Sequence, residues 1–253
     1  MLYDELKGKK VLVTGSSSGI GAATAKLFAS HGCFVGVHYF ETREGGVETL
    51  EKVKKLSDGI LLRADMRSEQ EVADMIVAFA SSAGGIDILV NNAGTLIHRY
   101  TIEEASLGFY EDIFATNVRS VFLATRAALP YLKKSSGCII NIGSVAGHNG
   151  GAGGSGIYAA AKAAVHTLTI AMAKEFGPYR IRVNTVSPGL IETRFHERFS
   201  TPQRRAAAAK ETPLGRNGSA DDIAGAILFL ASDSASFITG ENLAVNGGSL
   251  MRP

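Results

Sequence analysis

Short, continuously apolar segments alternate with longer amphipathic segments along almost the whole of this 253-residue chain. The apolar segments, which are rich in β-branched residues, cover residues 10–13, 34–38, 60–62, 86–90, 138–142, 181–186 and 243–245. Because they do not alternate with polar residues, they are typical of strands that are buried on both faces. The amphipathic segments predict helices at 20–30, 69–80, 109–132, 158–176 and 221–231. This order predicts a doubly wound α/β fold, in which a parallel sheet lies between two helical layers.

The composition excludes several classes of protein. The chain is 45% hydrophobic and has only 6 prolines beside its 29 glycines, so it is neither disordered nor fibrous. Its 26 basic and 24 acidic side chains nearly balance, which argues against a nucleic-acid partner. No apolar run approaches the roughly 18 residues that a membrane span needs, so we expect no membrane association.

Further features predict one cytoplasmic domain that covers residues 1–253. The first ten residues, MLYDELKGKK, lack the basic-then-apolar order of a signal peptide. Cys33 and Cys138 lie in separate apolar stretches and are predicted to be reduced, packed thiols. No Pro/Ser-rich linker divides the chain, and no metal site is expected. The long, charged segment 190–216, which contains Pro202 and Pro213, is predicted to be a substrate lid.

A glycine-rich turn follows the first predicted strand and leads directly into a helix. The turn reads TGSSSGIG from Thr14 to Gly21, so its glycines are spaced Gly-x3-Gly-x-Gly. Glycine lets backbone N–H groups approach a pyrophosphate closely, and the helix N-terminus adds a partial positive charge. The turn therefore predicts a dinucleotide site. The residues expected to contact the cofactor here are Gly15, Ser17, Ser18, Gly19, Ile20 and Gly21.

The end of the second predicted strand bears on the choice between NAD and NADP. An acid about 20 residues beyond the glycines selects NAD, whereas a cation selects NADP. The strand ends at Phe40 and is followed by Glu41 and Arg43, with no aspartate at its tip. This leaves room for a 2′-phosphate, for which Arg43 is a candidate partner, while Glu41 is either a solvated turn acid or a ligand of the 2′-hydroxyl. NADP(H) is the predicted cofactor and NAD(H) the alternative.

Further cofactor contacts are expected where the third and fourth strands end, because ligands of such folds lie at the carboxyl ends of the strands. Asp65 and Met66 follow the third strand, and the acid is placed to accept from an adenine amino group. Asn92, Ala93 and Gly94 follow the fourth, where the amide can tie neighbouring strands together and the glycine lets the dinucleotide pass.

A candidate reacting centre follows the fifth strand. Tyr158 and Lys162 are spaced i and i+4, which places them on one face of a helix. A tyrosine with its ordinary pKa near 10 is a poor acid–base group at neutral pH. A lysine one turn away is expected to favour the phenolate and lower that pKa. The hydroxyl of Ser144 is expected to hold a substrate carbonyl or alcohol nearby.

Together these motifs resemble the short-chain dehydrogenase/reductase family, which has a Rossmann-type fold. The resemblance is carried by TGSSSGIG, NNAG, Asn117 in ATNV, Ser144 in IGSV, the YAAAK of Tyr158 to Lys162, and the SPG that ends at Gly189. These motifs stand in the order and spacing of the family, and the match covers nearly the whole chain. Six glycines between Gly147 and Gly156 depart from the family pattern beside the substrate region.

The resemblance implies a role for each of these positions. Tyr158 would be the general acid–base, and Lys162 would lower its pKa and bind the nicotinamide ribose. Ser144 would orient the substrate, and Asn117 would hold a water that links Lys162 to solvent. The cofactor residues implied after the sixth strand are Pro188, Gly189, Ile191 and Thr193, of which the last two would meet the nicotinamide carboxamide.

The implied reaction interconverts a carbonyl and an alcohol on a small-molecule substrate by hydride transfer. The chain most resembles the 3-oxoacyl-carrier-protein reductase-like branch, which leaves open a 3-oxoacyl thioester, a sugar or polyol, or another small carbonyl. Lys133, Lys134 and Arg180 lie near positions where carrier-protein reductases bear basic residues. The family also implies a homotetramer, with a homodimer as the alternative. A non-catalytic dinucleotide sensor or scaffold is the competing hypothesis.

Overall fold

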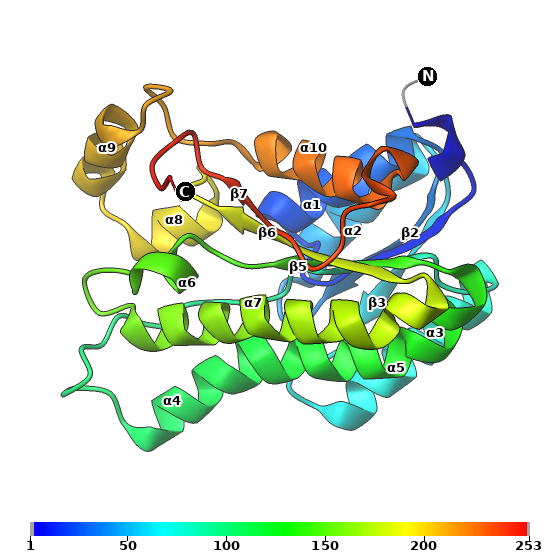
Figure 1. Ribbon diagram of the computed structural model, residues 1–253, viewed down its shortest axis with the longest axis horizontal. Helices are drawn as coiled ribbons and strands as arrows, with labels where there is room; N and C mark the ends of the chain where they lie inside the picture. The colour runs from blue at the N-terminus through cyan, green and yellow to red at the C-terminus, as the bar shows by residue number, and fades with distance from the viewer. Residues whose placement is uncertain (1–2, 252–253) are drawn as a thin grey trace.

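A seven-stranded parallel sheet forms the centre of the molecule, in a computed structural model that describes residues 3–251 (Figure 1). Its strands, in spatial order, are β3 (Gly59–Arg63), β2 (Phe34–Tyr39), β1 (Lys10–Val13), β4 (Ile88–Asn91), β5 (Cys138–Ile142), β6 (Arg182–Pro188) and β7 (Asn242–Val245). The predicted doubly wound fold is confirmed. Residues 1–2 and 252–253 of the expected domain lie outside the described residues.

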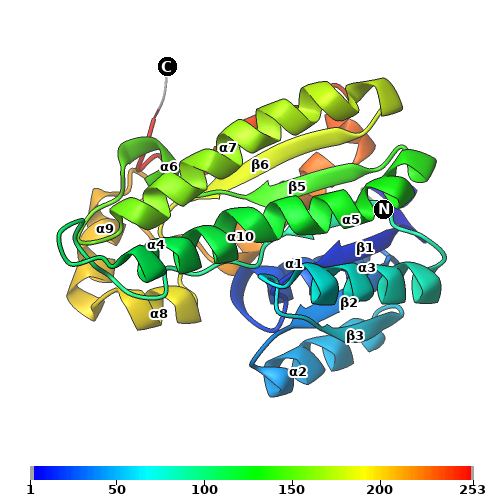
Figure 2. The ribbon, with the colours of Figure 1, turned by 90° about the horizontal axis from the view of Figure 1, so that it is seen from below.

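Helices cover both faces of the sheet, as its continuously apolar strands require (Figure 2). One face packs against α1 (Gly19–Ser30), α2 (Arg43–Lys54) and α10 (Ala220–Ala231). The other packs against α3 (Glu69–Ala83), α5 (Ser120–Ser135) and α7 (Gly156–Phe176), with α4 (Leu107–Phe114) against α7. Single 3₁₀ turns lie at Asp4–Leu6, Gly177–Tyr179 and Asp233–Ala235. Successive residues of β1 serve both layers, since Val11 and Val13 join one core and Leu12 the other.

The strand order reverses between β1 and β4, which are neighbours although two strands separate them in sequence. Loops that leave such neighbours diverge to opposite faces of the sheet, and the crevice between them is where doubly wound folds bind ligands. The glycine-rich turn follows β1, and the NNAG motif begins at the end of β4.

One helix was not predicted, and one expectation about a helix was wrong. The segment 43–54 forms α2 although Gly45 and Gly46 lower its helix propensity. Their lack of side chains is what allows the packing, because a Cβ at Gly45 would lie 2.5 Å from the Ser17 carbonyl oxygen. The single helix predicted at 109–132 is instead α4 and α5, joined by a π-helical turn at Ala115–Arg119.

The segment predicted as a lid is ordered into two helices, α8 (Arg194–Phe199) and α9 (Pro202–Glu211). Both views place them at the carboxyl end of the sheet, beside the short α6 (Ala146–Asn149) and the start of α7 (Figures 1 and 2). Among the helices of residues 3–251, none is both long enough and apolar enough to cross a membrane.

Candidate active site

A cavity of about 1010 Å³ opens at the carboxyl ends of β1 to β6. Most of the residues predicted to bind cofactor or substrate line it: Gly15, Ser17, Ser18, Gly19, Ile20, Phe40, Asp65, Met66, Asn92, Ala93, Gly94, Ser144, Tyr158, Lys162, Pro188, Gly189, Ile191 and Thr193. Three predicted residues do not line it: Gly21, Arg43 and Asn117. The tertiary structure thus brings together segments that the chain separates by more than a hundred residues.

The glycines of the first turn make room for backbone rather than for side chains. Gly15 has φ of +64°, and a Cβ there would lie 2.9 Å from the Ala93 Cα. A Cβ at Gly21 would lie 2.4 Å from the Gly15 carbonyl oxygen. The N-cap of α1, Ser18, makes no side-chain capping bond, so the start of this helix keeps its N–H groups available for an anion.

Asn92 and Thr14 hold the turn against the end of β4. The Asn92 side-chain amide donates to the carbonyl oxygens of Thr14 at 2.9 Å and of Gly15 at 3.0 Å. The Thr14 hydroxyl accepts from the backbone N–H groups of Asn92 and Ala93, both at 3.0 Å. These four bonds fix the two loops across the crevice.

His38, at the end of β2, was missed by the sequence analysis. Its Nδ1 accepts from the Gly15 backbone N–H at 2.8 Å, and its Nε2 donates to the Ala64 carbonyl oxygen at 3.0 Å. Only the neutral ring with its proton on Nε2 satisfies both partners. Burial lowers the pKa of His38 below its usual 6.5, against the opposing effect of the Ala64 bond. A lone polar residue in an otherwise apolar strand was the signal that could have found it.

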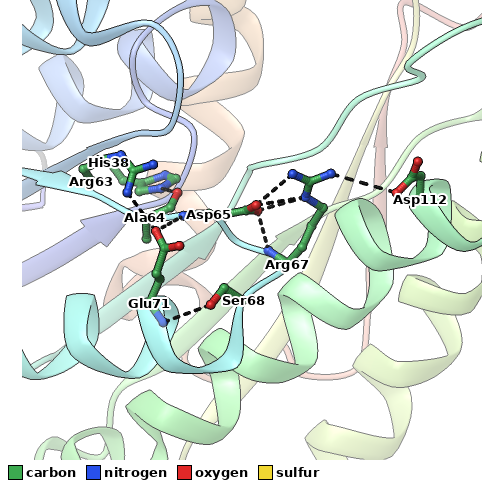
Figure 3. Close-up of polar contacts among 8 residues, drawn as sticks. All are labelled: His38, Arg63, Ala64, Asp65, Arg67, Ser68, Glu71 and Asp112. Atoms are coloured by element: carbon green, nitrogen blue, oxygen red, sulfur yellow. Dashed lines mark hydrogen bonds and ion pairs between the residues drawn. The ribbon is translucent and has the colours of Figure 1, made fainter.

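Arg67, which lines the cavity after β3, was also missed (Figure 3). Its Nε and Nη2 donate to both carboxylate oxygens of Asp65, and its Nη1 lies 3.9 Å from Asp112. The hydrogen bonds from Arg67 hold the pKa of Asp65 below its usual range. The guanidinium carbons of Arg67 and Arg63 lie 5.8 and 5.4 Å from the ring centre of Phe40. Asp65 therefore both lines the cavity and forms an ion pair with Arg67.

Arg43 does not stand where the sequence analysis expected it. It is the first residue of α2, it is exposed, and it does not line the cavity. Helix formation by 43–54 carries its side chain away from the strand tip, and Glu41 and Thr42 line the cavity in its place.

Ser144, Tyr158 and Lys162 meet in the cavity wall. Ser144 lies close enough to Tyr158 to lower the pKa of its hydroxyl, against the larger raising effect of burial, and the Ser144 Oγ accepts from the Ala146 N–H at 3.1 Å. The Lys162 ammonium is 5.7 Å from the centre of the Tyr158 ring and donates to the Ile142 carbonyl oxygen at 2.8 Å. Lys162 is buried, with 4% of its surface exposed.

The expected direction of the Tyr158 pKa is not what the structure gives. Burial raises the pKa of Tyr158 to about 12, and the nearby Ser144 side chain opposes that change only in part. Burial also lowers the pKa of Lys162 to about 8. The ammonium points at a backbone carbonyl rather than at the phenol, so desolvation outweighs its attraction for the phenolate. Tyr158 is accordingly protonated at neutral pH.

Asn117 lies behind this wall, in the π-helical turn. Its side-chain amide donates to the carbonyl oxygens of Thr95 and Ile113, at 2.8 and 2.9 Å. Its Oδ1 is buried and has no hydrogen-bond partner within residues 3–251. A Cβ on Gly94 would lie 2.7 Å from this Oδ1 and 3.2 Å from the Lys162 Nζ. An acceptor and a donor thus face the same small space, which Gly94 leaves open.

The α8 helix brings aromatic side chains over the reacting centre. The ring centre of Phe195 lies 6.1 Å from that of Tyr158 and 5.0 Å from that of Phe199. Ile191 and Thr193, which precede the helix, line the cavity as the sequence analysis expected. Segment 190–216 contributes much of the wall opposite Tyr158.

The three basic residues considered for carrier-protein docking lie elsewhere. Lys133 and Lys134 stand in the last turn of α5, just before β5, and Arg180 lies just before β6. They belong to the amino edge of the sheet and do not line the cavity. The Lys133 ammonium instead lies 3.8 Å from the centre of the Tyr179 ring.

Comparisons with known proteins agree with this architecture. Residues 15–249 match the family model described as enoyl-(acyl carrier protein) reductase. The chain is 42% identical to the 3-oxoacyl-(acyl-carrier-protein) reductase FabG of Vibrio cholerae, over 97% of this chain and 99% of that protein.

Solved structures give the same result. An NADH-dependent reductase described as responsible for alginate metabolism superposes with a TM-score of 0.91, at 36% identity, over 99% of this chain and 100% of the other. A short-chain dehydrogenase of Burkholderia cenocepacia in complex with NADP has a TM-score of 0.90 at 32% identity, over 96% and 98% of the two chains. The chain therefore belongs to the short-chain dehydrogenase/reductase family of NAD(P)-dependent oxidoreductases, in its 3-oxoacyl-carrier-protein reductase-like branch.

Proposed function

We propose that this protein reduces a ketone or aldehyde to an alcohol with NADP(H), using Tyr158 as the general acid. The observation that carries the proposal is that Ser144, Tyr158 and Lys162 line one cavity together with the glycine cradle that follows β1. A proton donor and a dinucleotide site in one enclosure are what carbonyl reduction by hydride transfer needs.

The residues present fit a nicotinamide dinucleotide. A Cβ at Gly15, Gly21 or Gly94 would meet backbone or polar atoms at less than 3.0 Å, so these positions exclude side chains beside the loops that a dinucleotide would follow. The start of α1 would hold the pyrophosphate, and Asn92, Ala93 and Gly94 would border its path. When bound, the cofactor supplies the hydride.

The raised pKa of Tyr158 suits the direction of reduction. A phenol that is protonated at neutral pH can give its proton to a carbonyl oxygen that is becoming an alkoxide, while the Ser144 hydroxyl donates to the same oxygen and orients it. The Lys162 ammonium and the Asn117 Oδ1, which has no hydrogen-bond partner among residues 3–251, both border the space that Gly94 leaves open. This space suits a water that returns the proton to Tyr158.

The preference for NADP(H) rests on the tip of β2. Phe40 stands there in place of an acid, with the guanidinium groups of Arg63 and Arg67 near its ring, and Arg67 lines the cavity. Titrating the protein with NADPH and NADH, followed by cofactor fluorescence, compares the two dissociation constants directly. Tighter binding of NADH would contradict this part of the proposal.

Segment 190–216 acts as the lid over the substrate in this proposal. Its Phe195 lies over Tyr158, so an ordered α8 would exclude water from the reacting centre.

A homotetramer is also part of the proposal, because Leu107, Tyr110, Phe122 and Ile170 expose apolar surface on α4, α5 and α7. Light scattering coupled to gel filtration measures the assembly, and a monomer at micromolar concentration would contradict it.

Replacing Tyr158 by phenylalanine tests the catalytic assignment. A panel of ketones, 3-oxoacyl thioesters and sugar acids is assayed at 340 nm with NADPH, and the best substrate is carried forward. Tyr158→Phe should lower kcat by about 10²–10⁴-fold, because general acid catalysis contributes about that much. The dissociation constant of NADPH should change little.

A matched variant removes the same hydroxyl elsewhere. Tyr179 lies outside the cavity, and Tyr179→Phe should leave kcat and cofactor binding unchanged. Turnover by Tyr158→Phe at the rate of the unaltered protein would refute the assignment. Tight NADPH binding with no turnover on the whole panel would instead favour a dinucleotide sensor.

A further inference from the structure

Arg99, in the loop between β4 and α4, joins three parts of the chain at the substrate end of the cavity. Its Nε donates to the Phe199 carbonyl oxygen at 2.8 Å, which ties it to the end of α8. Its Nη1 donates to the carbonyl oxygens of Ala152 and Gly153, at 2.8 and 3.0 Å. Arg99 itself lines the cavity, so three backbone carbonyls hold a cation in the cavity wall.

The glycines between α6 and α7 make this arrangement possible. Gly150, Gly151, Gly153 and Gly154 all have positive φ, between +55° and +80°, which favours glycine over other residues. A Cβ at Gly154 would lie 3.0 Å from the backbone nitrogen of Tyr100, so the loop also packs directly on the chain beside Arg99. The glycine-rich segment therefore holds Arg99, a role that its sequence did not disclose.

A second arginine reaches the same point from the lid. A Cβ at Gly153 would lie 3.1 Å from the Nη1 of Arg204, in α9, and 4.0 Å from the Nη1 of Arg99. Both arginines line the cavity. No carboxylate of the described chain, residues 3–251, lies within 4.0 Å of either guanidinium.

The neighbouring lid arginine shows what these two lack. Arg205 forms an ion pair with Glu192 at 3.0 Å, so its charge is compensated within the lid. Burial lowers the pKa of His196, another cavity residue, to about 4; Arg99, Arg204 and Arg205 add to this effect, and Glu192 opposes it. His196 therefore adds no further positive charge at neutral pH.

We propose that Arg99 and Arg204 form an anion subsite, and that the substrate is a small carbonyl compound that also carries a carboxylate. Two close guanidinium groups without acidic partners repel each other, and a planar carboxylate relieves this by accepting hydrogen bonds from both. The inference rests on the proposed function, because it names the substrate of the same cavity. It also separates this chain from a reductase of neutral substrates.

The test compares one charged aldehyde with its neutral counterpart. 4-Carboxybenzaldehyde and its methyl ester are each assayed with NADPH, using the full chain and the variant Arg204→Gln. Arg204 is chosen because its side chain is exposed and donates no hydrogen bond to the backbone of residues 3–251, whereas the Arg99 side chain also supports the loop and the lid. The control is Lys210→Gln, which removes one positive charge from the same helix, at an exposed residue outside the cavity.

We expect the acid to have a kcat/KM about tenfold above that of the ester, a difference of about 1.4 kcal/mol, because only the acid can accept a charge-assisted hydrogen bond from Arg204. Arg204→Gln should remove this preference, because it should lower kcat/KM for the acid about tenfold more than kcat/KM for the ester, while Lys210→Gln should change neither. Equal kcat/KM values for acid and ester in the unaltered protein, or an equal loss for both in Arg204→Gln, would overturn the anion subsite but not the proposed function.

A binding measurement keeps the two proposals separable. If neither aldehyde is reduced, the proposed function fails for these compounds, and calorimetric titration of the NADPH-bound protein with benzoate and benzamide decides the subsite alone. Benzoate should bind more tightly than benzamide, and Arg204→Gln should weaken benzoate about tenfold. Identical benzoate binding by the unaltered protein and Arg204→Gln would overturn the subsite.

Discussion

Replacing His38 by leucine isolates the contribution of one buried ring to both stability and cofactor binding. The ring is 2% exposed and is the hydrogen-bond partner of the Gly15 N–H and the Ala64 carbonyl oxygen. Leucine offers neither group a partner, and a buried polar group left unpaired costs about 1–3 kcal/mol. We therefore expect His38→Leu to lower the free energy of unfolding by about 2–6 kcal/mol, a large part of the roughly 5–15 kcal/mol of a typical domain.

The assay is urea denaturation of the cofactor-free protein at pH 7, paired with fluorescence titration of NADPH. Gly15 is part of the cradle, so His38→Leu should also weaken NADPH binding. His38→Asn is the matched control, since its Oδ1 can stand where the ring Nδ1 accepts from Gly15 while the bond to Ala64 is lost. The asparagine variant should recover about half of the stability and most of the affinity.

The pH dependence gives the same prediction a second readout. Burial lowers the pKa of His38 in the folded protein below its unfolded value near 6.5, so the unfolded chain binds the proton first as pH falls. The stabilising contribution is fully present above about pH 6.5 and is lost as pH drops toward the folded pKa. The difference between the unaltered protein and His38→Leu should therefore narrow on acidification. The reasoning would be refuted if the unfolding free energies of the unaltered protein and His38→Leu differed by less than about 0.5 kcal/mol at pH 7. It would also be refuted if His38→Leu were as stable as His38→Asn.

Three further predictions concern the cradle, the buried lysine and the cofactor. Gly21→Ala should weaken NADPH binding at least about tenfold, because the new Cβ would lie 2.4 Å from the Gly15 carbonyl oxygen. The control Gly225→Ala, in α10, has open space around it and should raise the unfolding free energy by about 0.5–1 kcal/mol. Lys162→Met should abolish turnover yet raise the unfolding free energy at pH 7 by about 1–3 kcal/mol. The folded pKa of Lys162 is about 8, so burying its charged amine destabilises the folded protein below pH 8, and this penalty fades as pH rises toward 10.5. A methionine variant that is less stable than the unaltered protein in urea denaturation at pH 7 would contradict this. Arg67→Gln should weaken NADPH about tenfold and NADH about twofold in fluorescence titrations, and equal losses would remove Arg67 from 2′-phosphate binding.

Local sequence patterns predicted the architecture well because the physical causes are local. Continuously apolar strands need helices on both sides, and the glycine-rich turn after β1 predicted a close backbone approach, which the structure shows at Gly15 and Gly21. The helical spacing of Tyr158 and Lys162 likewise places both on α7 without knowledge of the fold. Helix α2 was not predicted because its paired glycines lower helix propensity. Gly45 packs against the backbone of Ser17 and Gly46 against Leu61 and Tyr39, contacts that the sequence does not reveal.

Electrostatics at the site could not be predicted from spacing. The i,i+4 relation suggested that Lys162 lowers the pKa of Tyr158, but the folded chain buries both and turns the ammonium toward the Ile142 carbonyl. A pKa depends on desolvation and on the direction of each donor, and both are properties of the packed interior.

The sequence by itself determined the doubly wound sheet and the position of the glycine-rich turn, and its motifs singled out Ser144, Tyr158 and Lys162 as candidates, because each follows from short-range periodicity or from a motif. Only the tertiary structure decided how Arg99 is used. Its hydrogen bond to Phe199 joins residues 100 positions apart. Arg204, in α9, reaches the same point beside Gly153. Such contacts join segments that are far apart in the chain, and local sequence patterns do not predict which distant segments meet. The role of the glycines before α7, which is to hold Arg99, is therefore visible only in the folded protein.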